Sequence, residues 1–156
     1  VMGFDKDFGM AFAKSQIAAG NSLPTKGLAF ISLKNSHKTE GIDLAKSLTK
    51  LGFRLCGTKG TAEFIGKQGI NCKKINKVSS GSPNIVDVLN SKQIAIVINT
   101  GGGSRKDRVS DAREIRRATL RNKVPYCTNM STAQACLKSI KSLKTKEITV
   151  TALQDI

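Results

Sequence analysis

The sequence FRLCGTKGT at residues 53–61, followed by AEFIGKQG, predicts a strand, a tight turn and the start of a helix. Its first residues are apolar and suit a buried strand. Gly57 and Gly60 let the backbone turn sharply and come close to a ligand. Thr58 and Thr61 place hydroxyls where the helix would begin, and a helix start offers free N–H groups and a positive end to an anion. The turn therefore predicts a phosphate site, although an ordinary turn with a threonine N-cap has the same pattern.

Apolar runs of strand length alternate with helical patterns on both sides of this turn. Strands are expected at 28–33, 53–56, 73–76, 94–98, 125–127 and 147–151. Helices are expected at 5–19, 40–51, 62–69, 85–89, 110–121 and 132–143, with Thr39 and Ser131 as candidate N-caps. Residues 94–98, IAIVI, have no polar alternation, which is typical of a central parallel strand covered on both faces. The alternation predicts βαβ units, and so a parallel sheet between two layers of helices.

The first helix is expected to stand apart from this α/β unit. Its predicted apolar face has nothing nearby in the sequence to cover it and consists of Phe8, Ala11, Phe12, Ser15 and Ala19. Gly20 is a good helix stop, and NSLPTK after it is typical of a linker. We therefore expect a helix and linker over residues 1–25 and a domain over residues 26–156.

Composition limits the class of protein. A chain of 156 residues with 39% hydrophobic residues makes one domain with an ordinary core. No apolar run is long enough for a membrane span, and the N-terminus lacks the apolar core of a secretory signal. Because residue 1 is not Met, the chain is expected to be a piece of a longer protein. The four cysteines form no C-x-x-C pair, so we expect reduced thiols in a cytoplasmic protein and no metal site.

The net charge of +15 predicts an anionic partner, which could be a nucleic acid, a phosphorylated metabolite or an acidic neighbouring domain. Nucleic-acid binding is disfavoured because aromatic residues make up only 4% of the chain and no known nucleic-acid-binding motif is present. Part of the lysine excess is expected to be ordinary solvated surface.

The loops after the strands are where a parallel sheet binds ligands. Here they carry hydroxyls, cations and one amide, at Ser32, Lys38, Thr58, Thr61, Lys77, Asn99 and Thr100. Lysine and threonine suit phosphate, and asparagine can both donate to and accept from a base or ribose. These loops contain no carboxylate, and their single histidine, His37, is more simply a solvated loop residue. The site is therefore predicted to bind a phosphorylated ligand without doing chemistry on it.

The order and spacing of several motifs are similar to those of methylglyoxal-synthase-like domains. The segments are FRLCGTKGTAEFIGKQGI, INKVSSGSPNIVDVLN, IAIVINT and REIRRATLRNKVPYCT. In particular the chain resembles the C-terminal regulatory domain of the carbamoyl-phosphate synthetase large subunit, with VMGFDKDFGMAFAKSQIAAG similar to the last helix of the preceding synthetase domain. The resemblance implies a three-layer fold with a five-stranded parallel sheet.

The resemblance also implies a function and a set of ligands. Such a domain binds UMP as inhibitor and IMP as activator, and it shares an ornithine site with the preceding domain. The implied phosphate ligands are Lys38, Thr58, Thr61 and Lys77. The implied nucleoside contacts are Ser32, Asn99 and Thr100, and the implied ornithine-side pair is Tyr126 and Thr128.

The whole enzyme that the resemblance implies would be a ligase that makes carbamoyl phosphate for pyrimidine and arginine synthesis. It would use bicarbonate, glutamine-derived ammonia and ATP, with Mg or Mn in the synthetase domains and a separate glutaminase small subunit. The domain itself would need no cofactor and would have no catalytic residue.

Two departures and two alternatives accompany the resemblance. The family often has T-x-S-G or P-S-G after INT, where this chain has Gly101, Gly102 and Gly103, and Ser80 replaces a usual acid in the N-K-V loop. Both changes affect the expected base preference more than the phosphate site. The main alternative is a true methylglyoxal synthase, but the segment that holds its catalytic Asp reads GSPN at residues 81–84. A basic nucleic-acid-binding module is the other alternative.

Overall fold

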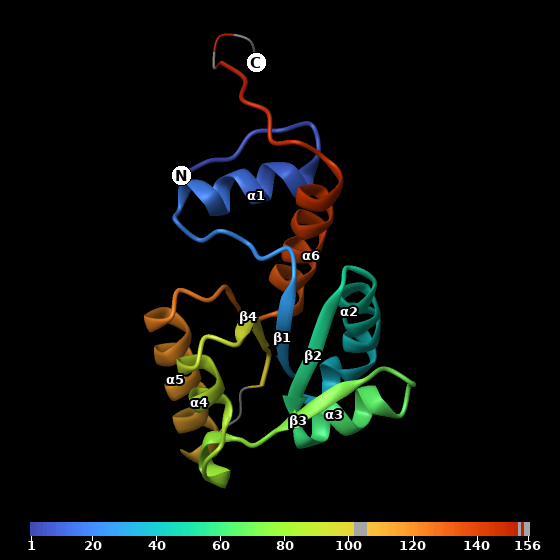
Figure 1. Ribbon diagram of the computed structural model, residues 1–156, viewed down its shortest axis with the longest axis vertical. Coiled ribbons are helices and arrows are strands. Elements are labelled where there is room, and N and C mark those ends of the chain that lie inside the picture. Colours follow the sequence, from blue (N-terminus) through green and yellow to red (C-terminus); the bar gives the residue numbers. More distant parts are fainter. Residues whose placement is uncertain (102–105, 153, 155–156) are drawn as a thin grey trace.

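The protein is an α/β sandwich built on a parallel sheet (Figure 1). A computed structural model describes residues 1–101, 106–152 and 154, with the side chains of residues 106–109 also outside the described part. Within this part, five strands lie in the order β3-β2-β1-β4-β5, and every pairing is parallel. They are β1 (Gly27–Ser32), β2 (Phe53–Thr58), β3 (Cys72–Ile75), β4 (Ile94–Asn99) and β5 (Tyr126–Cys127). The prediction of a five-stranded parallel sheet is confirmed.

Helices connect the strands as the sequence predicts. They are α1 (Phe8–Ala18), α2 (Lys38–Lys50), α3 (Lys59–Gly66), α4 (Ile85–Asn90), α5 (Lys106–Arg121) and α6 (Met130–Thr145). Two short 3-10 turns, η1 (Asn35–His37) and η2 (Val78–Ser80), follow β1 and β3. The predicted caps are wrong in both cases. His37 stands at the N-cap of α2, and Asn129 caps α6 by accepting from the Thr132 N–H at 2.8 Å.

The sheet has one hydrophobic core on each face. Strand residues alternate between the two: Ala29 and Ile31 pack with α2, α3 and α6, whereas Phe30 packs with α4 and α5. In β4, Ile96 and Ile98 join the first core and Val97 the second. The unbroken apolar run of β4 therefore reflects burial on both faces, as the sequence predicts for a central strand.

The order in which the chain adds strands to the sheet reverses between β1 and β4. The chain runs outward from β1 through β2 to β3, then crosses to β4 on the other side of β1. Ser32 and Asn99 lie opposite each other at the carboxyl ends of these two strands. Such a switch point leaves a crevice in which parallel sheets bind ligands.

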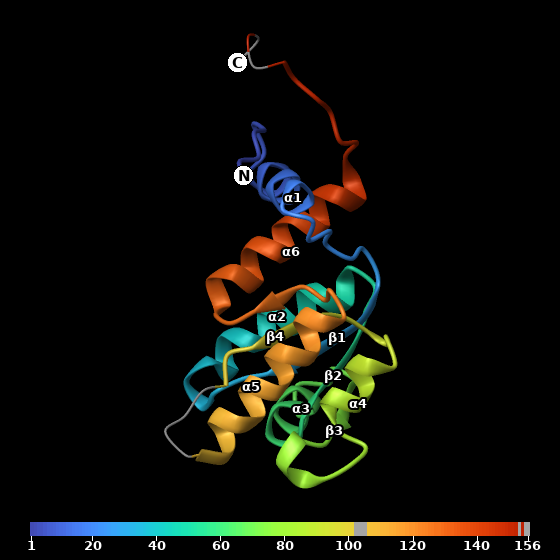
Figure 2. The same cartoon turned by 90° about the vertical axis from the view of Figure 1, so that its left-hand side faces the viewer.

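Helix α1 packs across α6, at the end of the molecule away from β3 (Figures 1 and 2). Its buried residues are Gly9, Met10 and Ala13, so the predicted apolar face is largely wrong, and Phe8 is 57% exposed. The reason is the close approach of the two helices. A Cβ on Gly9 would lie 2.6 Å from the Lys138 carbonyl oxygen, so only glycine permits the observed contact.

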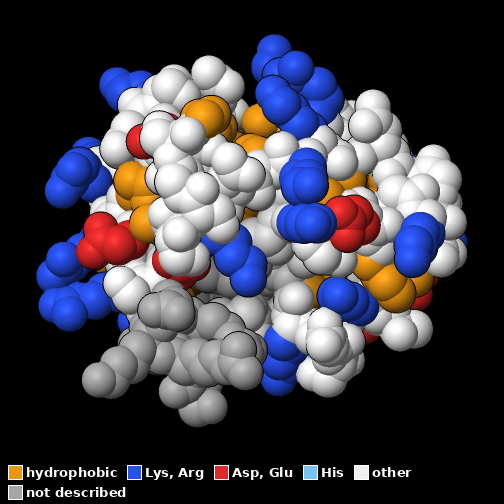
Figure 3. Space-filling view, turned by 90° about the horizontal axis from the view of Figure 1, so that it is seen from below, with side chains coloured by type: hydrophobic (Ala, Val, Ile, Leu, Met, Phe, Trp, Pro, Cys, Tyr) orange, Lys and Arg blue, Asp and Glu red, His pale blue; other side chains and the backbone are white. Residues whose placement is uncertain are grey.

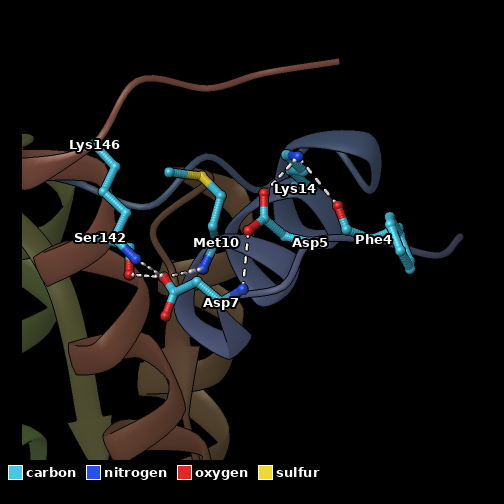
Figure 4. A network of polar contacts seen from close by, with 7 residues as sticks. All are labelled: Phe4, Asp5, Asp7, Met10, Lys14, Ser142 and Lys146. Carbon is cyan, nitrogen blue, oxygen red and sulfur yellow. Dashed lines mark hydrogen bonds and ion pairs between the residues drawn. The ribbon is translucent and has the colours of Figure 1, made fainter. Parts of the chain in front are cut away.

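Asp7 fixes the start of α1 against α6 (Figure 4). Its carboxylate accepts from the Met10 N–H at 3.2 Å and from the Ser142 hydroxyl, and it pairs with Lys146 at 3.3 Å. The Ser142 hydrogen bond, with help from Lys146 and the Met10 N–H, lowers the pKa of Asp7 below its usual value. Asp5 makes a second ion pair with Lys14 at 2.8 Å in the same segment.

The predicted strand at 147–151 is wrong. This segment follows α6 as irregular backbone, with Ile148 52% and Val150 96% exposed. Alternating apolar residues form a strand only where a neighbouring strand has a free edge. Here the chain leaves the sheet along α6 before it reaches residue 147, so the segment lies away from the edge strands β3 and β5 (Figure 1). None of the described helices is long and apolar enough to cross a membrane.

Candidate functional site

A cavity of about 260 Å³ opens at the carboxyl ends of the strands, over the switch point. Figure 3 views the molecule from this end and shows many Lys and Arg side chains with few acidic ones between them. Six residues predicted as ligands line the cavity together: Ser32, Lys38, Thr58, Thr61, Lys77 and Asn99. They come from four different loops, so the topology of the sheet brings them together from distant parts of the sequence.

Two threonine hydroxyls form the floor of the cavity at the start of α3. Thr58 is 7% and Thr61 is 2% exposed. The Thr61 Oγ1 accepts from the Leu33 N–H at 3.0 Å and from the Thr58 hydroxyl at 3.3 Å. Because Thr61 accepts in both described contacts, its own O–H can donate to a ligand in the cavity.

The two glycines of this turn have different roles. Gly57 belongs to β2, and a Cβ there would lie 2.5 Å from the Ile31 carbonyl oxygen, so this glycine permits close strand packing and not the turn itself. A Cβ on Gly60 would lie 3.7 Å from Lys38 Nζ. That distance is an ordinary contact, so Gly60 is not required by space, but it places the first turn of α3 beside a lysine, where backbone N–H groups favour an anion.

Three lysines surround this end of the cavity. Lys38 is half-buried, and its Nζ lies 5.6 Å from the centre of the Phe64 ring. Lys34 and Lys77 are exposed and line the cavity from the loops after β1 and β3. A cation cluster of this kind attracts a phosphate more strongly than a single lysine would.

Asn99 lines the cavity at the end of β4, opposite Ser32 of β1, and is 6% exposed. Its Oδ1 accepts from the Gly101 N–H at 3.1 Å, and its Nδ2 donates to the Tyr126 hydroxyl at 3.2 Å. Tyr126 is thereby joined to the cavity wall, whereas Thr128 is exposed on the segment after β5.

Thr100 was predicted as a nucleoside contact, but it is not one of the described residues that line the cavity. It is 7% exposed, and its hydroxyl accepts from the Lys34 N–H at 3.4 Å. Thr100 therefore orients the loop that carries Lys34. Of the other predicted loop residues, Gly101 lines the cavity, whereas Gly102 and Gly103 lie outside the described residues.

Sequence reasoning missed the wall that α4 and α5 provide. The residues in question are Ile85, Asp111, Ala112 and Ile115. The spacing of Asp111 and Ile115, four residues apart on a helix, places both on one face. That spacing is visible in the sequence and is the signal that points to this wall. The described lining of the cavity thus includes a carboxylate, that of Asp111, and both of its oxygens accept hydrogen bonds from Ser79.

The described residues hold no group of three or more His, Cys, Asp or Glu that would suit a metal ion. All four cysteines are free. Burial raises the pKa of Cys56 to about 12 and that of Cys72 to about 11, so neither thiol is poised as a nucleophile.

These features of fold and site define a class. A five-stranded parallel sheet carries a cationic, hydroxyl-lined cavity at its switch point, and the family model described as MGS-like domain matches residues 40–128. The chain belongs to the MGS-like domain family.

Relatives that match this chain along its whole length are carbamoyl phosphate synthase large chains. The chain is 43% identical over 154 residues to the carbamoyl phosphate synthase large chain of Rhizobium meliloti (strain 1021), covering 99% of this chain and 13% of that protein. It is 44% and 45% identical to the C-terminal sections of the same large chain in Methanopyrus kandleri and Aquifex aeolicus. These two matches extend over all of this chain and over 29% and 30% of those two proteins. The chain thus spans under a third of each of these relatives.

A solved structure shares the fold. The crystal structure of methylglyoxal synthase from Elizabethkingia anophelis NUHP1 superimposes with a TM-score of 0.56 and 16% identity, over 74% of this chain and 79% of that one. This likeness concerns the architecture alone.

Proposed function

We propose that this chain is the regulatory, nucleotide-effector-binding domain of a glutamine-dependent carbamoyl-phosphate synthetase large subunit, and that it is not itself catalytic. The observation that carries the proposal is the meeting of Lys38, Lys77, Thr58 and Thr61 in one cavity at the switch point. The similarity to carbamoyl phosphate synthase large chains supports the assignment to that enzyme. Such an enzyme would make carbamoyl phosphate for pyrimidine and arginine synthesis in the cytoplasm.

The lysine-rich end of the cavity suits the phosphate of a nucleoside monophosphate. Phosphate oxygens would meet the Thr61 O–H, the first N–H groups of α3, and the ammonium groups of Lys38 and Lys77. Each of these groups donates and none accepts, which matches an anion with several acceptor oxygens.

Other residues of the cavity lining suit the nucleoside. Asn99 and Ser32 offer polar contacts, and Ile85 and Ile115 offer apolar surface. A Cβ on Gly101 would lie 3.1 Å from Asn99 Oδ1 and 3.4 Å from Ser32 Oγ. Gly101 therefore leaves these two polar atoms accessible and contributes backbone alone. We expect UMP-type and IMP-type effectors here, with a base preference set by this glycine.

Regulation would couple the cavity to the rest of the enzyme. The hydrogen bond from Asn99 to Tyr126 links the cavity to the proposed ornithine-side pair, Tyr126 and Thr128. Residues 1–25 would belong to the preceding synthetase domain and residues 26–156 would form the regulatory domain. A coupling free energy of about 1–3 kcal/mol between the two sites is typical of such control. ATP, Mg or Mn and the glutaminase small subunit would act on other parts of the enzyme.

The alternative is methylglyoxal synthesis from dihydroxyacetone phosphate. The shared fold with a methylglyoxal synthase favours it, since both would place a phosphate over the same edge of the sheet. The catalytic Asp that the resemblance requires is replaced, because the loop before α4 reads GSPN. Asn84 in that loop caps α4 by accepting from the Val86 N–H at 2.9 Å.

Calorimetric titration of the chain with UMP, IMP and dihydroxyacetone phosphate tests the proposal, with turnover of the last compound followed in parallel. We expect UMP or IMP to bind and dihydroxyacetone phosphate to remain unchanged. Formation of methylglyoxal would establish the alternative. Failure of both nucleotides to bind would contradict an effector site in this domain.

A further inference from the structure

A two-point contact joins α5 to the loop that carries Lys77. Asp111 Oδ1 accepts from the Ser79 N–H at 3.0 Å, and Asp111 Oδ2 accepts from the Ser79 hydroxyl at 2.8 Å. Ser79 lies in η2, two residues after Lys77, and Asp111 lines the cavity. The contact therefore connects two walls of the cavity that are 32 residues apart in the sequence.

We propose that Asp111 and Ser79 form a clamp that holds Lys77 where it can meet the ligand phosphate. This inference rests on the proposed function, because it gives the cavity a residue pair that positions one of its phosphate ligands. Neither residue needs to touch the ligand. They act through Lys77, so both are positioning residues.

The loop between β3 and α4 needs such an anchor. Lys77, Ser79 and Ser80 are exposed, and the backbone hydrogen bonds of η2 run only within the turn, from the Ser80 N–H to the Lys77 carbonyl and from the Gly81 N–H to the Val78 carbonyl. Among the described hydrogen bonds, those of Asp111 are the ones that tie residues 77–81 to a helix elsewhere in the chain. Without such a tie, an exposed loop would lose conformational entropy when the ligand binds, and this loss would weaken binding.

The far end of the same loop has its own anchor. Asp87 accepts from the Ser82 hydroxyl at 2.7 Å and from the Asn84 N–H at 2.8 Å. These bonds hold residues 82–84 onto the first turn of α4. At the Lys77 end, the Asn76 carbonyl accepts from the Ile85 N–H at 3.3 Å and Val78 packs against the second core, and Asp111 adds the side-chain tie at Ser79. The two carboxylates thus fix opposite ends of one loop.

Because Asp111 is charged, loss of its charge and loss of its hydrogen bonds should change the ligand affinity in opposite directions. A carboxylate in the wall of a phosphate-binding cavity repels the ligand, so removal of its charge alone should strengthen binding. Removal of the clamp should weaken binding, because Lys77 is then no longer held in place. The two consequences are separable by the choice of substitution.

Asp111→Asn and Asp111→Ala form the matched pair. Asparagine can still accept from the Ser79 N–H and can donate to the Ser79 Oγ, so it keeps both contacts without the charge. Alanine keeps neither contact. We expect Asp111→Ala to weaken UMP and inorganic phosphate binding about tenfold, through loss of preorganisation. Asp111→Asn should bind both as tightly as the parent or more tightly. Asn and Ala both lack the charge, so binding by Asp111→Ala as tight as that by Asp111→Asn would overturn the clamp.

Amide hydrogen exchange without ligand provides the second measurement. The amides of residues 77–81 should exchange faster in Asp111→Ala than in the parent or in Asp111→Asn, and Ser79→Ala should lie between them because it keeps the backbone contact. Unchanged exchange in Asp111→Ala would overturn the clamp. If the parent binds neither UMP nor phosphate, the proposed function fails, and exchange alone still decides whether the clamp orders the loop.

Discussion

At the scale of single residues, Thr61 has a structural role in addition to the binding role proposed for it. Its Oγ1 is the acceptor for the buried Leu33 N–H at 3.0 Å. Thr61→Val keeps the shape but removes that acceptor, so we expect a loss of about 1–3 kcal/mol in the free energy of unfolding together with weaker UMP binding. Thr61→Ser keeps the hydroxyl and should retain most of both. Urea denaturation and calorimetry measure the two effects, and a Thr61→Val chain that binds UMP normally would contradict the proposed phosphate contact.

Lys77 is expected to act on binding alone. Its side chain is exposed at the rim of the cavity, so Lys77→Ala should leave the midpoint of thermal unfolding unchanged. UMP affinity should fall about tenfold, because a charge-assisted contact is lost. Lys46→Ala is the matched control, since Lys46 is an exposed lysine of α2 outside the cavity lining. Equal affinities for the two variants would show that Lys77 does not contact the phosphate.

Most of the loop residues that line the cavity could be predicted from the sequence, because a strand-turn-helix pattern fixes where hydroxyls and helix N–H groups lie. Gly57 shows the limit of that reasoning. It looks like a turn residue, but its need for glycine comes from the Ile31 carbonyl of the neighbouring strand, and strand neighbours are not visible in a local pattern.

At the scale of secondary structure elements, the end of β4 and β5 form one unit through Asn99 and Tyr126. Tyr126→Phe removes the acceptor for Asn99 Nδ2, whose bond to the tyrosine hydroxyl is 3.2 Å long. We expect UMP to bind more weakly while inorganic phosphate binds as before, because only the nucleoside end of the cavity is altered. Competition titrations with the two ligands compare these affinities. Equal weakening of both would show that the substitution disturbs the whole cavity.

Docking of α1 onto α6 should depend on pH through Asp7. The pKa of Asp7 is lowered in the folded chain, chiefly by the Ser142 hydroxyl. The contribution of Asp7 is therefore fully present above its unfolded pKa of about 4 and is lost as the pH falls through its lower folded value. Asp7→Asn should reproduce the effect at neutral pH as faster amide exchange in α1, with Asp43→Asn as control. Unchanged exchange in Asp7→Asn would show that the packing of Gly9 and Met10 holds α1 on α6 without Asp7.

The order of the elements could be predicted, but the partners of the exposed ones could not. The segment at 147–151 has the composition of a strand, but α6 carries the chain away from both edges of the sheet before that segment begins. Similarly, the buried face of α1 is set by Gly9 meeting α6, about 130 residues away in the sequence. Long-range packing of this kind overrides local periodicity.

At the scale of the whole molecule, the net charge of +15 allows two kinds of anionic partner. Nucleic acid held by many lysines would lose roughly a thousandfold or more in affinity between about 50 and about 200 mM salt. A single phosphate in a built cavity should lose far less over the same range. Titrations of UMP and of an unrelated DNA duplex at both salt concentrations separate the two. Tight DNA binding with a steep salt dependence, and none of UMP, would favour a nucleic-acid-binding module.

The central claim is that the cavity at the switch point binds the phosphate of a nucleotide. An NMR titration of the isotopically labelled chain with UMP tests it most directly, because every backbone amide reports its own surroundings. We predict that the largest shifts occur at Thr58, Gly60, Thr61, Lys77 and Asn99. A second groove lies between α2 and α6 and is lined by residues such as Leu44, Ser47, Leu137 and Lys141. Shifts confined to that groove, or none at saturating UMP, would contradict the claim.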